Sequence, residues 1–289
     1  FGLLNKLLRK GNIRLDGKRA KSDTRIEGGQ EIRIPPLETG DDAPKRVYKL
    51  TKQDLSLIDD IRLFEDDHMM IINKPAGLAV QGGTKSNDRN LDLIMTAYAA
   101  TLGDDVTCKL VHRLDKETSG VQIFAKSRIA AQQLARQFKG KDIQKTYLCL
   151  TRGVPLPHEG EIKKPLLRIK EKVIVEYDEG KPSTTQYQVL DTAGHKVAIV
   201  QAMPLTGRTH QIRVHMASIG TPLLGDDKYN ENFHDESEKA MMEDFNHLFL
   251  HAYAIDIIHP KNKKKMHFVA PLPRHFHEIF KFFGFDSPV

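Results

Sequence analysis

The sequence has few cysteines and no long apolar run, and each shortage argues against a class of protein. Only Cys108 and Cys149 occur in 289 residues, too few for a disulfide framework, which favours a reducing cytoplasm. The apolar stretches, such as residues 69–72, fall far short of the roughly 20 residues that a membrane span needs. The 39% hydrophobic content nevertheless suffices for a buried core.

Motifs for nucleotide, metal and hydrolase sites are also missing. Gly82 and Gly83 lack the spacing and the Lys-Ser/Thr ending of a phosphate-binding loop. His247 and His251 are four residues apart, but the glutamate of a helical metalloprotease site is absent between them. The neighbours of Ser119 do not match the Gly-x-Ser-x-Gly elbow of serine hydrolases, and neither cysteine lies in a paired zinc motif. We therefore expect no metal and no cofactor.

Positive charge is concentrated at the beginning of the chain. Residues 1–36 hold nine basic and four acidic side chains, and so carry +5 of the net charge of +6. This balance predicts either a module that binds a polyanion or a solvated basic surface, and charge alone does not choose between them. The side chains expected to bind RNA are Lys6, Arg9, Lys10, Arg14, Lys18 and Arg19.

The apolar pattern of this segment favours an RNA-binding module. Leucines at positions 3, 4, 7 and 8 predict a helix that ends at Gly11, and Asp16-Gly17 predicts a tight hairpin. A short strand is expected over residues 31–34. This order resembles the second half of an S-four-like RNA-binding domain. Because the helical pattern is already under way at Phe1, we expect a longer natural protein whose first module helix lies upstream.

A linker is predicted over residues 37–60, which are rich in charges and turn formers and have little apolar periodicity. A second domain is expected over residues 61–289. Strands are predicted at residues 69–72, 121–125, 146–150, 173–175, 183–190 and 197–202, and helices at 90–101 and 128–138. Several strands with few helices favour an α+β fold with a mixed, largely antiparallel sheet over a doubly wound nucleotide-binding fold.

The most informative segment is His-Arg-Leu-Asp-Lys-Glu-Thr-Ser-Gly at residues 112–120, a polar turn that leads into a strand. The guanidinium of Arg113 beside Asp115 favours the ionised form of the carboxyl group. A permanent anion suits a nucleophile or an electrostatic stabiliser better than a general acid. Taken alone, an aspartate in such a turn more often has only a structural role.

These nine residues match the signature HRLDxxTSG of the RluA-type pseudouridine synthases. Residues 73–77, 145–147 and 207–215 resemble three further motifs of that family, in the same order along the chain. The resemblance covers roughly residues 61–275. It implies a pseudouridine synthase catalytic domain, an isomerase that breaks the glycosidic bond of uridine, turns the uracil and rejoins carbon five to the ribose.

The resemblance also implies roles for particular residues. Asp115 would either attack the anomeric carbon or remove the neighbouring ribose proton, and the sequence leaves both routes open. Arg213 would pair with Asp115, Tyr147 would stack on the uracil, and Arg113 would fill the space left by the flipped-out base. The further residues expected to contact the base or the RNA are Leu114, His112, Ile212, Arg208 and Lys74.

Within the family, the resemblance is greatest to members that modify 23S ribosomal RNA, although Gln81 stands where many relatives have histidine. The expected partner is therefore 23S ribosomal RNA, and the expected protein is a cytoplasmic monomer with no membrane association. Three alternatives stay open: a sister synthase for other ribosomal or transfer-RNA uridines, a non-catalytic RNA-binding protein of ribosome assembly, and a nucleoside hydrolase or glycosidase.

Overall fold

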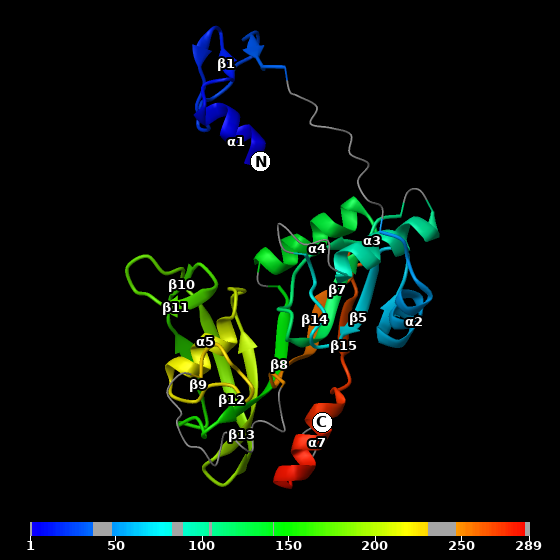
Figure 1. Cartoon of the computed structure of the whole chain (residues 1–289), viewed down its shortest axis with the longest axis vertical. Coiled ribbons are helices and arrows are strands. Elements are labelled where there is room, and N and C mark those ends of the chain that lie inside the picture. Colours follow the sequence, from blue (N-terminus) through cyan, green and yellow to red (C-terminus); the bar gives the residue numbers. More distant parts are fainter. Residues whose placement is uncertain are drawn as a thin grey trace. The chain divides into compact units, whose positions relative to one another are not determined.

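The structure is a computed structural model that describes residues 2–36, 48–82, 89–103, 106–140, 142–230 and 247–286. The chain divides into a first unit, Phe1–Val47, and a second unit, Tyr48–Val289 (Figure 1). Within the described ranges, no helix has the length and apolar character that crossing a membrane requires.

The first unit has the predicted order of helix, hairpin and strand. Helix α1 (Gly2–Arg9) precedes strands β1 (Arg14–Leu15), β2 (Lys18–Arg19) and β3 (Ile32–Arg33), which form a small antiparallel sheet in the order β2-β1-β3. Asp16 and Gly17 both have positive φ angles, 48° and 76°, as a type I′ hairpin turn requires.

The basic side chains of this unit point outward. Those that the structure describes as exposed are Arg9, Lys10, Arg14, Lys18, Arg19, Lys21, Arg25 and Arg33, whereas the side chain of Lys6 lies outside the described residues. The unit therefore presents its positive charge to solvent, where phosphate groups can reach it. Its likeness to an S-four-like domain stays a prediction.

The second unit begins earlier than the sequence predicted. All but the last residue of helix α2 (Lys52–Ile61) lies inside the segment predicted to be a linker, and Thr51 and Asp54 form a capping box at its start. Ile58 and Ile61 of this helix are buried in the core of the second unit. The predicted linker is therefore wrong for residues 48–60, because two apolar side chains one turn apart anchor a helix most of whose residues are polar. Residues 37–47 lie outside the described residues.

One ten-stranded sheet organises the second unit, in the order β4-β5-β7-β14-β8-β13-β12-β9, with β15 paired to β14 and β6 to β7. Only β7 and β14 pair in parallel among these described strands, so the predicted α+β fold with a mixed, largely antiparallel sheet is confirmed. The strands of the sheet are β4 (Arg62–Glu65), β5 (Met69–Lys74), β6 (Lys109–Leu110), β7 (Ser119–Ala125), β8 (Gln144–Arg152), β9 (Glu159–Lys163), β12 (Thr184–Ala193), β13 (Val197–Pro204), β14 (Leu250–Ile258) and β15 (Lys265–Val269). A separate hairpin consists of β10 (Leu166–Ile169) and β11 (Lys172–Val175).

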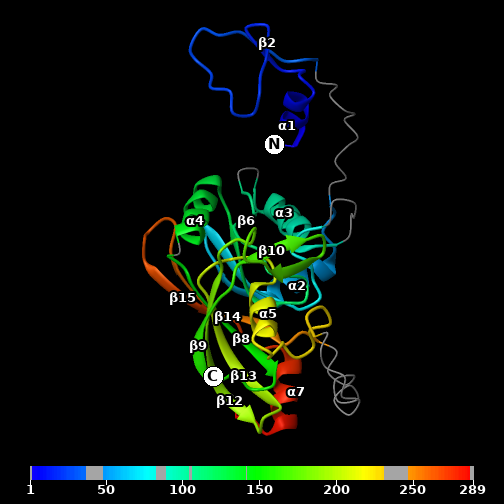
Figure 2. The same ribbon diagram turned by 90° about the vertical axis from the view of Figure 1, so that its left-hand side faces the viewer.

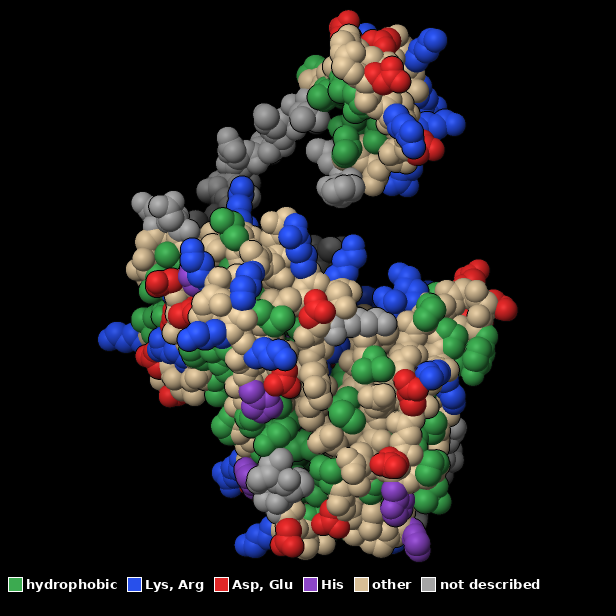
Figure 3. Space-filling view, turned by 180° about the vertical axis from the view of Figure 1, so that it is seen from behind, with side chains coloured by type: hydrophobic (Ala, Val, Ile, Leu, Met, Phe, Trp, Pro, Cys, Tyr) green, Lys and Arg blue, Asp and Glu red, His purple; other side chains and the backbone are tan. Residues whose placement is uncertain are grey.

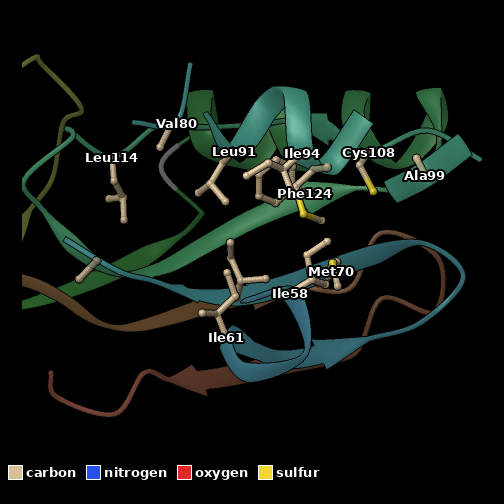
Figure 4. Packing of buried hydrophobic residues seen from close by; sticks show 13 residues of the cluster. Ile58, Ile61, Met70, Val80, Leu91, Ile94, Ala99, Cys108, Leu114 and Phe124 are labelled. Carbon is tan, nitrogen blue, oxygen red and sulfur yellow. The ribbon is translucent and has the colours of Figure 1, made fainter. Parts of the chain in front are cut away.

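Alternate residues of β5 serve two cores on opposite faces of the sheet, as the period of two in a strand requires. Met70 and Ile72 pack in one cluster with α2 and α3 (Leu91–Leu102) (Figure 4). Met69 and Ile71 pack in another cluster with α4 (Arg128–Gly140). Both faces of this half of the sheet are therefore covered.

The other half of the sheet follows the same rule. Cys149 of β8 faces a cluster that includes Ile212 of α5 (Gln211–Ser218), so this helix lies against β8 and β13 (Figure 2). The adjacent Leu150 faces a cluster with Phe276 of α7 (Arg274–Phe283). Helix α5, which carries part of the arginine motif, is thereby fixed directly over the strand that carries Tyr147.

The two halves of the sheet meet where β7 and β14 run side by side. Gly120 pairs with Ala252 across this junction and has a φ angle of 110°, which residues with a side chain rarely adopt. A Cβ atom at Gly120 would lie 2.2 Å from the carbonyl oxygen of Ala252. The glycine of the 112–120 motif is thus required for this close approach of two backbones.

A buried carboxylate secures the beginning of the second unit. Asp54 is fully buried and accepts hydrogen bonds from Tyr48, Thr51 and Arg89, the last at 2.8 Å. Burial by itself would raise the pKa of Asp54, but the hydrogen bonds from Thr51 and Arg89 outweigh it and lower the pKa to about 2. The ionised Asp54 carboxylate therefore contributes fully to the free energy of unfolding above pH ~4, the pKa of an unfolded aspartate. This contribution is lost as the pH falls through about 2.

We expect Asp54→Asn to lower the free energy of unfolding by about 2–3 kcal/mol at pH 7, because an amide neither pairs with Arg89 nor accepts the same set of bonds. Denaturant unfolding of both proteins between pH 7 and pH 2 measures this, and the difference should shrink below pH 4. Asp60→Asn, an exposed position on the same helix, is the matched control. Equal losses in the two variants would contradict the role of Asp54.

Candidate active site

A cavity of about 800 Å³ opens beside the turn that carries Asp115. Its wall is formed by residues 112–116 and Thr118, the end of α4, the start of β8, hairpin β10–β11 and residues 204–213. The basic side chains on the wall are Arg113, Lys116, Lys139, Lys145, Arg168, Arg208, Arg213 and Lys228. Only Asp115 and Glu171 are acidic among the described lining residues. The cavity therefore suits a polyanionic ligand.

The turn that holds Asp115 is anchored on its carboxyl-terminal side by Lys74. The Lys74 side chain is fully buried, and its ammonium donates to the carbonyl oxygens of Pro75, Leu78 and Lys116 at 2.8–2.9 Å. The backbone N–H of Gly77 donates to the same Lys116 oxygen at 3.0 Å. Burial lowers the pKa of Lys74 to about 7, against the opposing effect of Glu117 and Asp115.

The other side of the turn is anchored by Gln122. Its side-chain oxygen accepts from the N–H of Leu114 at 3.2 Å, and its side-chain nitrogen donates to the carbonyl of His112 at 2.9 Å. The His112 ring accepts from the N–H of Ile123 at 3.0 Å and stacks on Phe138. Burial lowers the pKa of His112 to about 3, so the ring is neutral at pH 7. Asp115 thus lies between Leu114 and Lys116, whose backbone groups are both held by hydrogen bonds.

The Asp115 carboxylate itself stays accessible, with 28% of its side chain exposed. Among the described residues, its ion-pair partner within 4 Å is His210, whose Nε2 lies 3.8 Å from Asp115 Oδ2. Leu114 and Ile212, both nearly fully buried, line the same cavity and supply apolar surface. An anion, an apolar wall and a basic rim are therefore brought together.

Strand β8 brings two side chains of the Lys-Thr-Tyr segment to this cavity. Tyr147 lies on the wall, and burial together with the charge of Asp115 raises the pKa of its hydroxyl, so the phenol is neutral at pH 7. Lys145 donates to the carbonyl oxygen of Thr206 at 3.1 Å and ties β8 to the segment before α5. Burial lowers the pKa of Lys145 to about 8.

The expected pairing of Arg213 with Asp115 is wrong. Arg213 instead forms a two-bond fork with Asp226, with both bonds at 2.7 Å, and both side chains are buried. A guanidinium taken out of water needs a close bidentate partner, and Asp226 supplies one from the loop after α5. Asp115 acts on Arg213 through its charge alone, as one of several influences on the pKa of Arg213.

The other predicted residues divide between the cavity wall and its support. Arg113 and Arg208 line the cavity and are exposed, and Arg208 also contacts the carbonyl of Pro182 at 3.4–3.5 Å. The expected contact of Lys74 with the base or the RNA is not found. Lys74 does not line the cavity, and its ammonium donates to three carbonyl oxygens instead. His112 lines the cavity, but one of its ring nitrogens is already used by the backbone.

Sequence reasoning missed several residues of the site: Asp226, Tyr229, His210, Lys145, Lys139 and Phe138. One signal was present, because an arginine between apolar neighbours in a helix needs a buried acid. Nothing in the sequence distinguishes Asp226 from the adjacent Asp227, yet their side chains are 0% and 97% exposed. Among the described residues, no cluster of three or more His, Cys, Asp or Glu side chains could hold a metal ion.

Residues 68–218 match the family model described as RNA pseudouridylate synthase. This chain belongs to that family. The match contains the loop of Asp115, the strand of Tyr147 and the arginine motif, and it confirms the resemblance read from residues 112–120. As a pseudouridine synthase, the protein is an isomerase.

Relatives with curated names extend this result over most of the chain. The chain is 36% identical over 274 residues to "Ribosomal large subunit pseudouridine synthase C" of Escherichia coli K12, covering 93% of this chain and 84% of that protein. The enzyme of the same name from Haemophilus influenzae is also 36% identical, covering 93% of this chain and 83% of the relative.

A solved structure of this family has the same fold. "Human RNA Pseudouridylate Synthase Domain Containing 4" superposes with a TM-score of 0.70 at 27% identity, covering 82% of this chain and 99% of the human chain. "Human RNA Pseudouridylate Synthase Domain Containing 1" superposes with a TM-score of 0.59 at 26% identity, covering 74% of this chain and 83% of the human chain. The sheet and its helices are thus those of a pseudouridine synthase.

We expect Asp226→Asn to lower the free energy of unfolding by about 3–5 kcal/mol, because it leaves the buried Arg213 charge unpaired. Asp227→Asn, at the exposed neighbouring position, should change it by no more than about 0.5 kcal/mol. Denaturant unfolding of the two variants measures the contrast. Similar losses would show that Asp226 is not the partner on which Arg213 depends.

Proposed function

We propose that this chain converts specific uridines of large-subunit (23S) ribosomal RNA to pseudouridine, with Asp115 as the essential anion. One observation carries the proposal: the accessible carboxylate of Asp115, in a turn fixed on both sides, lies beside apolar side chains on the wall of a basic cavity. The relatives named large-subunit pseudouridine synthase C support the choice of RNA.

The reaction needs an anion at the ribose and a pocket that retains the detached base. Asp115 either attacks the anomeric carbon or removes the adjacent ribose proton, and both routes need its ionised form. The neutral Tyr147 phenol stacks on the uracil, and Leu114 and Ile212 exclude water from the detached base. Arg213, held by Asp226, contributes positive charge near Asp115.

Binding of the RNA relies on charge. A stacked uridine has to be flipped out of its helix, which costs a few kcal/mol, and the exposed planar cation of Arg113 is suited to fill the vacated stack. Phosphates meet the basic cavity rim and the exposed Lys and Arg side chains of both units, which are distributed over the face in Figure 3. The monomeric state and the cytoplasmic location stay predictions.

We expect Asp115→Asn to abolish pseudouridine formation, because an amide of the same shape has no negative charge. Release of tritium from 23S ribosomal RNA labelled at carbon five of uridine measures turnover, and gel shift measures RNA binding, which should persist. Glu171→Gln, at the other acid of the described wall, is the matched control. A rate for Asp115→Asn above about a tenth of wild type would refute the role of Asp115.

The same assay separates the alternative functions. A protein that only binds RNA releases no tritium, and a nucleoside hydrolase releases free uracil. Mapping pseudouridines in 23S, 16S and transfer RNA transcripts after incubation tests the substrate. Modification restricted to 16S or transfer RNA would replace the proposed substrate with that of a sister synthase.

We expect the first unit to determine RNA affinity and not turnover. Residues 1–36 carry +5 of the net charge, whereas the cavity and its cores lie in the second unit. Deleting residues 1–47 should therefore weaken binding to large RNA fragments and flatten its dependence on salt, because fewer phosphates are neutralised. The measurement is the binding constant at several salt concentrations, together with turnover at saturating RNA.

A deletion that leaves the salt dependence unchanged would contradict this division of labour, as would a loss of turnover at saturating RNA. Replacing Lys18 and Arg19 by glutamine in the full chain is a milder variant that removes two exposed charges of β2, together with the hydrogen bond that Arg19 donates to the carbonyl of Arg9. It should move the salt dependence in the same direction by a smaller amount.

A further inference from the structure

A chain of hydrogen-bonding groups leads from hairpin β10–β11 to the Asp115 carboxylate. The backbone N–H of Val173, in β11, donates to the hydroxyl of Tyr229 at 3.0 Å. The same hydroxyl lies 2.7 Å from Nδ1 of His210. The other ring nitrogen of His210 faces Asp115 at 3.8 Å. The reaction as proposed above uses neither His210 nor Tyr229.

The hydrogen-bonding capacity of these groups determines where the protons lie. A phenol has one proton to donate, and the Tyr229 oxygen already accepts from Val173. If Tyr229 donates to Nδ1 of His210, the proton of the neutral ring must be on Nε2. In the opposite assignment the ring proton is on Nδ1 and is donated to the Tyr229 oxygen. The phenol proton then has no acceptor among the described residues, and the lone pair of Nε2 faces the Asp115 carboxylate. The Nε2–H form is therefore favoured.

Tyr229 is held from several directions, so it can fix the ring of His210. Its backbone N–H donates to Asp226 at 3.2 Å, and the guanidinium of Arg213 lies 5.1 Å from the centre of its ring. The rings of His210 and Tyr229 meet edge to face. The buried ion pair of Arg213 and Asp226 thus also supports Tyr229.

The backbone of His210 is unusual at the same place. His210 precedes α5 with a φ angle of 52°, in the left-handed region that residues other than glycine rarely occupy. Such backbone costs of order 1–3 kcal/mol and persists only where surrounding contacts determine it. Here those contacts are the bond to Tyr229 and the packing that leaves 13% of the His210 side chain exposed.

We propose that His210 is a positioning residue that orients the Asp115 carboxylate by donating from Nε2–H, and that Tyr229 fixes the required tautomer. This inference rests on the proposed function of Asp115. At 3.8 Å the contact is too long for a hydrogen bond, and it has to shorten by about 1 Å when substrate fills the cavity.

The charges around His210 agree with a neutral donor. The groups that face it are Asp115, Arg213, Lys228, Asp226 and Tyr229. Burial lowers the pKa of His210, Arg213 and Lys228 lower it further, and Asp115 and Asp226 raise it without reversing the direction. The ring is therefore neutral at pH 7, and its Nε2–H acts as a dipole and not as a counter-ion.

The tautomer can be measured directly on the whole chain. Two-bond ¹H–¹⁵N correlation spectra of the ¹⁵N-labelled protein distinguish a proton on Nε2 from one on Nδ1, and the signals missing in His210→Gln identify the residue. We expect Nε2–H in the wild type and a mixture of tautomers in Tyr229→Phe. Tyr187→Phe, which also loses one hydroxyl bond, to Pro157, should leave the His210 signals unchanged.

Turnover provides the second readout. Glutamine at position 210 places an amide N–H near the position of Nε2, whereas asparagine tolerates the left-handed backbone but is too short to reach Asp115. We expect His210→Asn to lower kcat ~10–100-fold and His210→Gln to lower it less, with KM for RNA within ~3-fold of wild type in both. Tyr229→Phe should also lower kcat, but by less than His210→Asn does.

Three results would overturn the inference. The first is a wild-type spectrum with the proton of His210 on Nδ1, and the second is a spectrum that Tyr229→Phe does not change. The third is a His210→Asn variant that turns over as fast as His210→Gln at equal thermal stability. If the wild type releases no tritium, the proposed function is refuted, but the contact between His210 and Asp115 is not. Spectra of Asp115→Asn then test that contact, because loss of the carboxylate must shift the Nε2–H signal of His210.

Discussion

The parallel pairing of β7 with β14 is the contact on which the rest of the second unit depends. It is possible because Gly120 has no side chain, so that its backbone can approach that of Ala252. Through this junction the strand that follows the Asp115 turn is joined to β14, and β14 pairs on its other side with β8, which carries Tyr147. Without it, the two walls of the cavity would belong to separate sheets.

Buried polar groups then hold each segment of the site in place through hydrogen bonds. The ammonium of Lys74 and the amide of Gln122 hold the turn on either side of Asp115, and the fork between Arg213 and Asp226 holds the loop after α5. Each of these groups costs free energy to remove from water, and each recovers it only with its partners in place. A displaced loop would therefore leave a buried charge unpaired, which makes the arrangement of the cavity specific.

Much of the second unit could be predicted from local pattern. Strand β7 and helix α4 form where the residues of their own segments predict a strand and a helix, and the Ser127 hydroxyl caps α4. Helix α2 has the local pattern of a linker, because most of its ten residues are polar. Its buried residues Ile58 and Ile61 are recognisable only from the core that other segments supply. The roles expected for Lys74 and Arg213 failed for the same reason, since a basic residue in a motif does not reveal whether it meets a ligand or a carbonyl.

The sequence by itself determined the family, the secondary structure of most of the sheet and the position of the accessible carboxylate, because motifs, apolar periods and turn residues are properties of short segments. Only the tertiary structure decided the partners: Asp226 and not Asp115 for Arg213, three carbonyl oxygens for Lys74, and Tyr229 for His210. These choices depend on burial and on distances between segments that are far apart in the chain. Whether a charge is buried is set by everything that packs around it, and no single segment contains that information.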